Sequence, residues 1–416
     1  MQIILDQNNS LGILAVKIWI KEGSSHDEKD KKGAHHLLGS LLSRGCGPYS
    51  HINVAEKIEG NGASLRCETY EDGLLISLKC YHEDAKSLLP IIGWMIAKPH
   101  INSDQLNLEL ELAMQALLRK TESPLQTTYD GWRRVAYGDG PYGHDPLGSP
   151  EDLKRITKND LHILSQKIKD NNIILSLSGN FKDSLLKDIE SMEPFNIIYN
   201  KLKTHTAKGL ESAKHKPIAE EMISLEHQET EQVIIMIGNP TIPYWHESDI
   251  YLRLLSNHLG CGMSSYLFKE LREKNGVAYE VGVHHPIRER EAPFILHAST
   301  TEDKALKTLL LLNESLKKIS TATLSESELD LAISKYKGQI AHSIQTASQR
   351  AEKNAYLKGF NLPKDHQESL IGRLDLATKD RMQETALNFF KRPLISLCGR
   401  EKTLNKLKEK WIEISY

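Results

Sequence analysis

Residues 33–46 read GAHHLLGSLLSRGC, a short apolar run that contains two adjacent histidines. Its leucine pairs predict an apolar helix that carries His35 and His36. Two imidazoles one helical turn apart can bind one zinc ion, and a glutamate between them can polarise the metal-bound water. One turn after His36 the chain has Gly39 and Ser40. A serine hydroxyl is a poor zinc ligand and glycine supplies no base, so the run keeps one imidazole of such a site.

A second stretch, residues 259–279, reads LGCGMSSYLFKELREKNGVAY. It predicts a glycine-rich turn, a helix and the entry to a strand. Gly260 and Gly262 precede the helix N-terminus, where backbone N–H groups can bind phosphate. We do not expect nucleotide binding, because the chain lacks G-x-x-x-x-G-K-[ST], and lacks G-x-G-x-x-G followed by an acid about twenty residues later.

Together the two stretches resemble the pitrilysin/insulinase superfamily of zinc metallopeptidases, in its processing-peptidase-like branch. The inverted zinc helix of that family reads H-x-x-E-H before an apolar pair and a basic-Gly-small ending. Aligned from Arg44-Gly45, residues 36–40 of this chain read HLLGS. The family's general base therefore falls on Gly39 and its second histidine on Ser40.

The third zinc ligand of the family is the second Glu of a V-L-E-E-I-like helix segment. Counted back from the Glu-Ser-Pro ending at residues 122–124, that position is Ala116 here. Glu109 lies two turns earlier and matches a family acid that supports the site, but on an exposed helix we expect only a solvated charge. The resemblance thus implies no metal in this chain, with degenerate positions at His36, Gly39, Ser40 and Ala116.

The second stretch resembles the family's other signature, S-x-L-F-x-E-L-R-E-K followed by G-x-A-Y, except that Tyr266 stands where Arg is usual. In the family an Arg and a Tyr, here Arg272 and Tyr279, reach the scissile peptide from the half without zinc. A guanidinium can hold substrate carbonyls, and a phenol can donate to the oxyanion. A glycine-rich loop, here Gly260 and Gly262, is linked to substrate capture. From the residues alone, a surface charge and a half-buried strand aromatic remain the alternative.

The family also binds extended substrate along a strand that reads G-G-S-L-N-A. Here residues 62–67 read GASLRC, so Arg66 and Cys67 occupy the Asn and Ala positions. One interpretation is decay of a substrate strand in the first half. The other is an edge-strand charge that blocks aggregation.

Composition indicates a large globular protein of 416 residues, with 39% hydrophobic residues and a net charge of −2. That length can bury more than one core. The longest apolar run, residues 88–97, is too short to span a bilayer, and the near-neutral charge does not favour nucleic acid. The N-terminus lacks a basic signal-peptide region, and five scattered cysteines indicate reduced thiols, so we expect a cytoplasmic protein that binds no membrane.

The sequence repeats itself. Glu83 and Glu302 open similar helices 219 residues apart, and Leu106 and Leu329 open the next pair 223 residues apart. Residues 13–20 and 233–237 predict strands, and Ser325 with Glu328 predicts a capping box that opens one long helix over residues 327–359. We therefore expect an α+β fold of two duplicated halves, each a β-sheet packed with helices, forming one half of a clamshell (metallopeptidase LuxS/processing-peptidase-like). The expected domains are residues 1–205 and 221–416, with a linker at 206–220.

The resemblance implies a non-zinc-binding partner subunit of a heterodimeric zinc metalloendopeptidase. A homologous subunit with an intact H-x-x-E-H would bind zinc, while this chain would close the chamber over a peptide substrate and supply Arg272 and Tyr279 in trans. Alone it would be inactive. The alternative is a catalytically inert peptide-binding or structural scaffold of the same fold.

Overall fold

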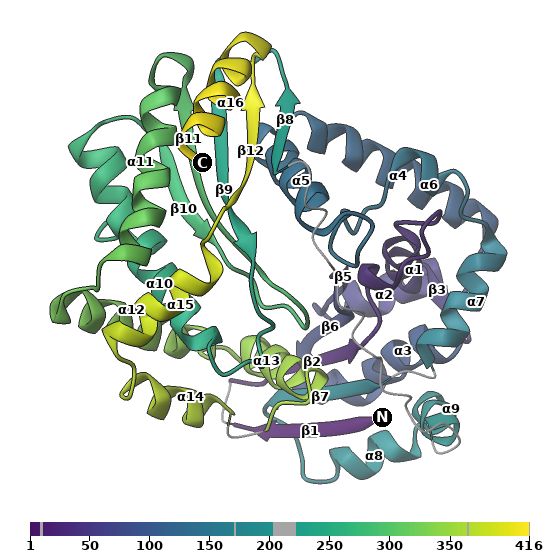
Figure 1. The fold of residues 1–416 in the computed structure, drawn as a ribbon. Helices are drawn as coiled ribbons and strands as arrows, with labels where there is room; N and C mark the ends of the chain where they lie inside the picture. Colours follow the sequence, from purple (N-terminus) through teal and green to yellow (C-terminus); the bar gives the residue numbers. More distant parts are fainter. Residues whose placement is uncertain (9–10, 170–171, 203–221, 364–365, 416) are drawn as a thin grey trace. The chain divides into compact units, whose positions relative to one another are not determined.

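The computed structural model describes residues 1–8, 11–169, 172–202, 222–363 and 366–415. They form two compact units (Figure 1). Unit 1 contains most of the first half of the chain and one helix of the second half. Unit 2 contains most of the second half and one helix of the first half. Among the helices of the described residues, none combines the length and the apolarity needed to cross a bilayer.

Unit 1 is built on a five-stranded sheet in which only the first pair of strands is parallel. The strands in spatial order are β1 (Gln2–Gln7), β7 (Ile173–Gly179), β2 (Ile13–Ile20), β6 (Leu74–Tyr81) and β5 (Ser64–Thr69). The central strand β2 is buried along nearly its whole length and coincides with the strand predicted at residues 13–20. β5 is an edge strand on which Arg66 is exposed, as the edge-charge interpretation expects.

Helices cover both faces of this sheet, which buries both sets of alternating side chains. The helical elements and the small hairpin of unit 1 are η1 (Ser24–His26), α1 (Ala34–Leu42), β3 (Gly45–Cys46), β4 (Tyr49–Ser50), α2 (His51–Gly60), η2 (His82–Asp84), α3 (Ala85–Ala97), α4 (Ser103–Thr121), α6 (Pro150–Leu153), α7 (Lys158–Lys169), α8 (Leu185–Ser191), α9 (Glu193–Leu202) and α13 (Ala347–Gly359).

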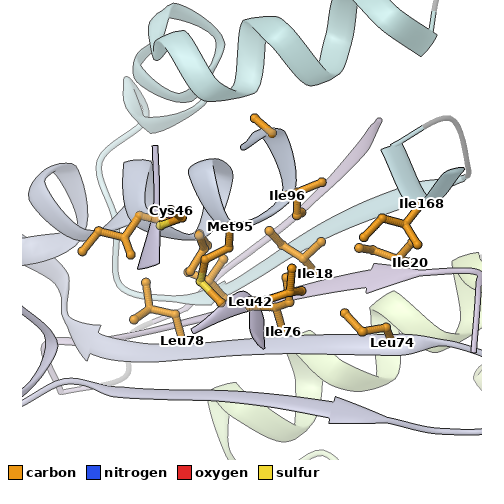
Figure 2. Packing of buried hydrophobic residues seen from close by; sticks show 14 of the residues in the cluster. Ile18, Ile20, Leu42, Cys46, Leu74, Ile76, Leu78, Met95, Ile96 and Ile168 are labelled. Carbon is orange, nitrogen blue, oxygen red and sulfur yellow. The ribbon is translucent and has the colours of Figure 1, made fainter. Parts of the chain in front are cut away.

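The larger core of unit 1 lies between the sheet and helices α1, α3 and α7 (Figure 2). Alternate residues of β2 and β6 meet helix residues there, namely Ile18, Ile20, Leu74, Ile76, Leu78, Leu42, Met95, Ile96 and Ile168. The residues between them, such as Trp19 and Leu75, face the opposite side and pack with Ala355 of α13. α13 therefore covers the second face of the sheet, against β2 and β7.

Unit 2 repeats the same sheet. Its strands in spatial order are β8 (Ile223–His227), β12 (Leu394–Gly399), β9 (Gln232–Pro240), β11 (Pro293–Thr301) and β10 (Glu280–His284). Again only the first pair, β8 and β12, is parallel. The strand predicted at residues 233–237 is part of β9. Since both sheets share one connectivity, the duplicated α+β halves expected from sequence are confirmed.

The helices of unit 2 again lie on both faces of its sheet. They are α5 (Pro124–Tyr137), α10 (Asp249–Gly260), η3 (Phe268–Lys274), α11 (Glu302–Thr321), α12 (Glu326–His342), α14 (His366–Leu374), α15 (Lys379–Phe389) and α16 (Glu401–Ser415). η3 is a π-helix, with a wider turn than an α-helix.

One helix of each half belongs to the other unit. α5 packs on β8, β9 and β12 of unit 2, and α13 packs on β2 and β7 of unit 1 (Figure 1). The two helices begin at residues 124 and 347, 223 residues apart, which equals the offset between Leu106 and Leu329. The compact units therefore differ from two contiguous segments at 1–205 and 221–416, and most of the linker expected at 206–220 lies outside the described residues.

The single helix predicted over residues 327–359 is wrong. α12 ends at His342 and α13 begins at Ala347, because Thr346 starts a new helix. Its Oγ1 accepts from the Gln349 backbone N–H at 3.2 Å, while Gln349 Oε1 accepts from the Thr346 N–H at 3.0 Å. The capping box predicted at Ser325 and Glu328 is confirmed by the equivalent pair of hydrogen bonds.

Candidate functional site

The position of the missing glutamate on α1, Gly39, is closed by packing. Gly39 is buried, and a Cβ at this position would lie 2.6 Å from Thr69 Oγ1 and 3.1 Å from Leu74 Cδ1. Thr69 Oγ1 is itself held, because it donates to the His35 carbonyl at 3.2 Å. A glutamate side chain at residue 39 would therefore meet β5 and β6 at closer than van der Waals contact.

His36 and Ser40 lie on the half-buried side of α1. Burial lowers the pKa of His36, although the nearby Glu109 carboxylate opposes the shift. Ala116 of α4 offers no ligand atom. Within the described ranges, no group of three His, Cys, Asp or Glu side chains is arranged to hold a metal ion. These residues do not fit the zinc ion that binds to H-x-x-E-H.

Glu109 differs from the sequence expectation of a solvated charge. It is 7% exposed, and its Oε1 accepts from both Nε and Nη2 of Arg44 at 2.6 Å. Leu106, Glu109 and Ala113 form the buried face of α4, so the helix periodicity places this carboxylate inward. Arg44 follows α1, and the ion pair therefore ties the end of α1 to α4.

A buried charged cluster precedes the motif and was missed by the sequence analysis. His35 is 1% exposed, and its Nδ1 donates to Asp27 Oδ1 at 2.6 Å. The second oxygen of Asp27 accepts from the Gly33 N–H at 2.7 Å and lies 3.4 Å from His144 Nε2. Gly33 has φ +97°, a left-handed conformation that suits glycine at the start of α1.

The opposite ring nitrogen of His35, Nε2, lies 3.6 Å from Glu22 Oε1, which is an ion-pair distance. Glu22 is 3% exposed and is also paired with Lys167 of α7. Burial opposes ionisation of all three groups in this chain of charges. The opposite charges prevail, so the pKa of His35 is raised, while the pKa values of Glu22 and Asp27 are lowered to about 2. We call Glu22, Asp27 and His35 the α1 charge cluster.

The predicted Arg and Tyr lie on one continuous segment of unit 2, residues 268–279, which we call the η3–β10 segment. Arg272 is an exposed residue of the π-helix, with its guanidinium 5.0 Å from the Phe268 ring centroid. Tyr279 is 66% exposed at the entry to β10. Among the described residues, neither polar side-chain group has a hydrogen bond or an ion pair.

The backbone around these two side chains is firmly held. The Val277 N–H donates to the Leu271 carbonyl at 2.9 Å, and the Tyr279 N–H donates to the Ser299 carbonyl at 2.9 Å. Thr300 Oγ1 donates to the Val277 carbonyl at 2.5 Å. The segment thus presents a cation and a phenol on a rigid support.

The glycine-rich loop between α10 and η3 is also fixed. A Cβ on Gly260 would lie 2.6 Å from the Val283 backbone nitrogen, so glycine permits close packing of α10 on β10. Gly262 has φ +74° and open space around it. Lys335 of α12 donates to the carbonyl of Cys261, between the two glycines, at 2.8 Å.

Comparison with known proteins agrees with this reading of the two stretches. The family model described as "Insulinase (Peptidase family M16)" matches residues 2–133, and the model described as "Peptidase M16 inactive domain" matches residues 155–336. The chain is 23% identical to the "Uncharacterized zinc protease YmxG" of Bacillus subtilis, over 94% of this chain and 93% of the relative. An "Uncharacterized zinc protease" of Rickettsia felis is 24% identical, over 70% of this chain and 69% of the relative.

Solved structures show the same fold. A peptidase M16 inactive domain from Pseudomonas fluorescens matches with a TM-score of 0.83 and 19% identity, over 96% of this chain and 95% of the other. A protease from Helicobacter pylori matches with a TM-score of 0.82 and 18% identity, over 95% and 96%. The chain therefore belongs to the insulinase family of peptidases, family M16, and carries Gly39 and Ser40 where the zinc helix of that family has its base and second histidine.

Proposed function

We propose that this chain is the non-zinc-binding subunit of a heterodimeric zinc metalloendopeptidase of the processing-peptidase type. The observation that carries the proposal is the state of Arg272 and Tyr279. Both are exposed on a rigid segment, and their polar groups make no hydrogen bond or ion pair with the described residues. The only ring contact of the two is that of the Arg272 guanidinium with Phe268 on the same π-helix, among the described residues, so the donors of both side chains are available to a bound peptide.

The chemistry assigns each side chain a role. Arg272 would hold backbone carbonyls of the substrate in its planar fork of donors. The Tyr279 hydroxyl would donate to the oxyanion that forms when water attacks the scissile carbonyl. Gly260 and Gly262 would serve substrate capture in different ways: Gly260 lets the loop pack closely on Val283 of β10, and Gly262, with open space around it, would let substrate backbone approach. The complex would work in the cytoplasm, as the scattered free cysteines favour.

The zinc ion and the general base would come from a homologous subunit with an intact H-x-x-E-H. The state of α1 supports this division of labour, because Gly39 is packed against Thr69 and Leu74 and supplies no base. A catalytic zinc site needs three protein ligands, and here the ligand positions retain only His36.

Two measurements on purified proteins test the proposal. Metal analysis of this chain alone should find no stoichiometric zinc, and peptide cleavage should be absent. Mixed with a zinc-bearing homologue from the same organism, the chain should form a stable heterodimer at micromolar concentration and raise its peptidase activity. One tightly held zinc per chain, lost in His36→Ala, would contradict the assignment.

The heterodimer experiment also distinguishes the alternative of an inert scaffold. If the two chains co-purify but Arg272→Ala and Tyr279→Phe leave the peptidase rate unchanged, the chain is a scaffold. If they migrate separately and the activity of the homologue is unaffected, the partnership itself is wrong. A homodimer without metal would favour a peptide-binding protein.

A further inference from the structure

Unit 2 contains a pocket of about 330 Å³ that shares no lining residue with the η3–β10 segment. It lies among α11, α15, α16 and the residues that lead into β12. Its apolar wall includes Leu316, Phe390, Trp411 and Ile414. This volume falls at the lower end of the range for small-molecule sites, and such sites combine an apolar lining with a few polar groups.

The first polar group is the amide of Asn313. This residue is 7% exposed, and its side chain has no hydrogen-bond partner in the described part of the chain. Because the amide bonds to no described residue, it is available to a molecule in the pocket. The amide carries two donors and one acceptor, so a molecule in the pocket could both accept from Asn313 and donate to it.

The second feature is positive charge without a counter-charge. Lys317, Lys391 and Arg392 line the pocket, and none of the lining residues is acidic. Lys317 Nζ donates to the Ile414 carbonyl at 3.3 Å, whereas the other two side chains make no ion pair with any described residue. An anion in the pocket would therefore meet three cations.

The third feature is backbone strain at the rim. Arg392 has φ +50°, although it is neither glycine nor asparagine, and it precedes Pro393. A left-handed conformation at such a residue costs on the order of 1 kcal/mol or more, and residues before proline favour extended backbone. Strain of this kind concentrates at binding sites, and here it is found at one of the cations.

We propose that this pocket binds the carboxylate of an N-acylated apolar amino acid, either free or as the C-terminal residue of a peptide. The apolar side chain packs against Phe390 and Trp411. The carboxylate meets Lys391 and Arg392, and the amide of the ligand bonds to Asn313. Neither the family assignment nor the role of Tyr279 is needed for this site.

The test measures binding to the full-length chain by isothermal titration calorimetry, with N-acetyl-L-phenylalanine as the probe. We expect saturable binding with a Kd at or below about 1 mM. N-acetyl-L-phenylalaninamide has the same size but no charge, and should bind at least about tenfold more weakly. Equal binding of acid and amide, or no saturable binding of the acid, would overturn the proposal.

Substitutions locate the site. Lys391→Gln combined with Arg392→Asn removes two charges, and asparagine tolerates the left-handed backbone, so binding of the acid should weaken at least about tenfold. Lys408→Gln, on an exposed face of α16 outside the pocket, is the matched control and should bind like the unmodified chain. Unchanged binding in the double variant would overturn the proposal even if the acid binds.

Asn313→Leu separates a ligand-binding amide from a structural one. It removes an amide that bonds to no described residue and keeps the volume, so the melting temperature should change little while the acid binds several-fold more weakly. A lower melting temperature with unchanged binding would mean that the amide is structural and would refute its role in binding.

Peptides ending in Phe with a free or an amidated C-terminus distinguish the two sources of the ligand, a peptide end and a free N-acylated amino acid. Preference for the free-carboxylate peptide identifies a peptide end, and binding of the free acid alone identifies a small molecule.

Discussion

The α1 charge cluster of unit 1, next to the degenerate zinc motif, and the η3–β10 segment of unit 2, within the second signature, hold their polar residues in opposite states. In the first, His35 and its carboxylates are buried and paired with one another. In the second, Arg272 and Tyr279 are exposed, without a hydrogen bond or ion pair to any described residue. Removing one partner of a buried charge pair destabilises the fold, whereas exposed groups without an ion pair on a rigid backbone are free to bind. The comparison separates what this chain needs in order to fold from what it offers to a substrate.

The largest effect is expected from truncation of the buried histidine. His35→Ala leaves Glu22 and Asp27 buried without their shared cation, which should lower the free energy of unfolding by about 3–5 kcal/mol. His36→Ala is the matched control on the neighbouring residue, and should cost about 1 kcal/mol or less because His36 makes no hydrogen bond to any residue that the structure describes. Urea unfolding followed by circular dichroism measures both. Equal costs would show that the zinc-position histidine still has a structural role.

In the η3–β10 segment we expect substitutions to lower activity and to leave stability unchanged. In the assembled heterodimer, Tyr279→Phe should lower the turnover number about 10²-fold with little change in KM, because the phenol acts chiefly in the transition state. Arg272→Ala should weaken both substrate binding and turnover. Neither should change the free energy of unfolding by more than about 0.5 kcal/mol.

Lys274→Ala, on the same π-helix, is the control for these kinetics. Among the described residues its Nζ pairs only with Glu270, on the surface, so the variant should retain the wild-type rate. Steady-state kinetics of the three variant heterodimers, each checked for assembly and zinc content, measures these effects. If Tyr279→Phe prevents heterodimer formation, Tyr279 contacts the partner subunit and its proposed role at the substrate is wrong.

A smaller effect is expected at Gly39. Gly39→Ala would place a Cβ 2.6 Å from Thr69 Oγ1 and 3.1 Å from Leu74 Cδ1, so the Thr69 side chain must shift and Leu74 must give slightly, which should cost about 1–3 kcal/mol. Gly39→Glu with Ser40→His restores two motif residues but should still bind zinc poorly, because Ala116 supplies no third ligand. Metal analysis and urea unfolding of the two variants measure these outcomes. Stoichiometric zinc in the double variant would show that another side chain completes the site.

The sequence allowed the duplicated fold to be predicted because each signature has local spacing and each sheet has local strand patterns. It did not reveal which sheet a helix covers. The periodicity of α5 and α13 shows that one face is buried, but only long-range contacts decide that each packs on the sheet of the other half. The break before Ala347 had a local signal, the Thr346 and Gln349 capping box, that could have been recognised.

The polar residues were harder to interpret for the same reason. Glu22 and Asp27 lie in a hydrophilic stretch that reads as a solvated loop, and their partners Lys167 and His144 are more than 100 residues away. Glu109 is paired with Arg44, 65 residues earlier. Degenerate positions can be found by alignment to a motif, whereas charge pairing across the fold requires the structure.

The smallest effect is the pH dependence that His35 gives to stability. The pKa of His35 is raised in the folded state, so its contribution is fully present below the unfolded imidazole pKa of about 6.5 and is lost as pH rises through the folded pKa. The pKa values of Glu22 and Asp27 are lowered to about 2, so their contributions are present above about pH 4 and are lost as pH falls toward 2. The stabilising effect of the α1 charge cluster should therefore be greatest between about pH 4.5 and 6.5.

His35→Gln tests this window, since it removes the titrating cation and keeps a donor in the same place. The difference in unfolding free energy between the wild type and this variant should be largest near pH 5–6 and should narrow as pH rises above about 7. Arg272→Gln is the control, because Arg272 is exposed in the η3–β10 segment. Its free energy of unfolding should differ from that of the wild type by the same amount at every pH in this range. A difference for His35→Gln that does not change with pH would mean that His35 is neutral in the folded chain, and that burial outweighs its two carboxylates.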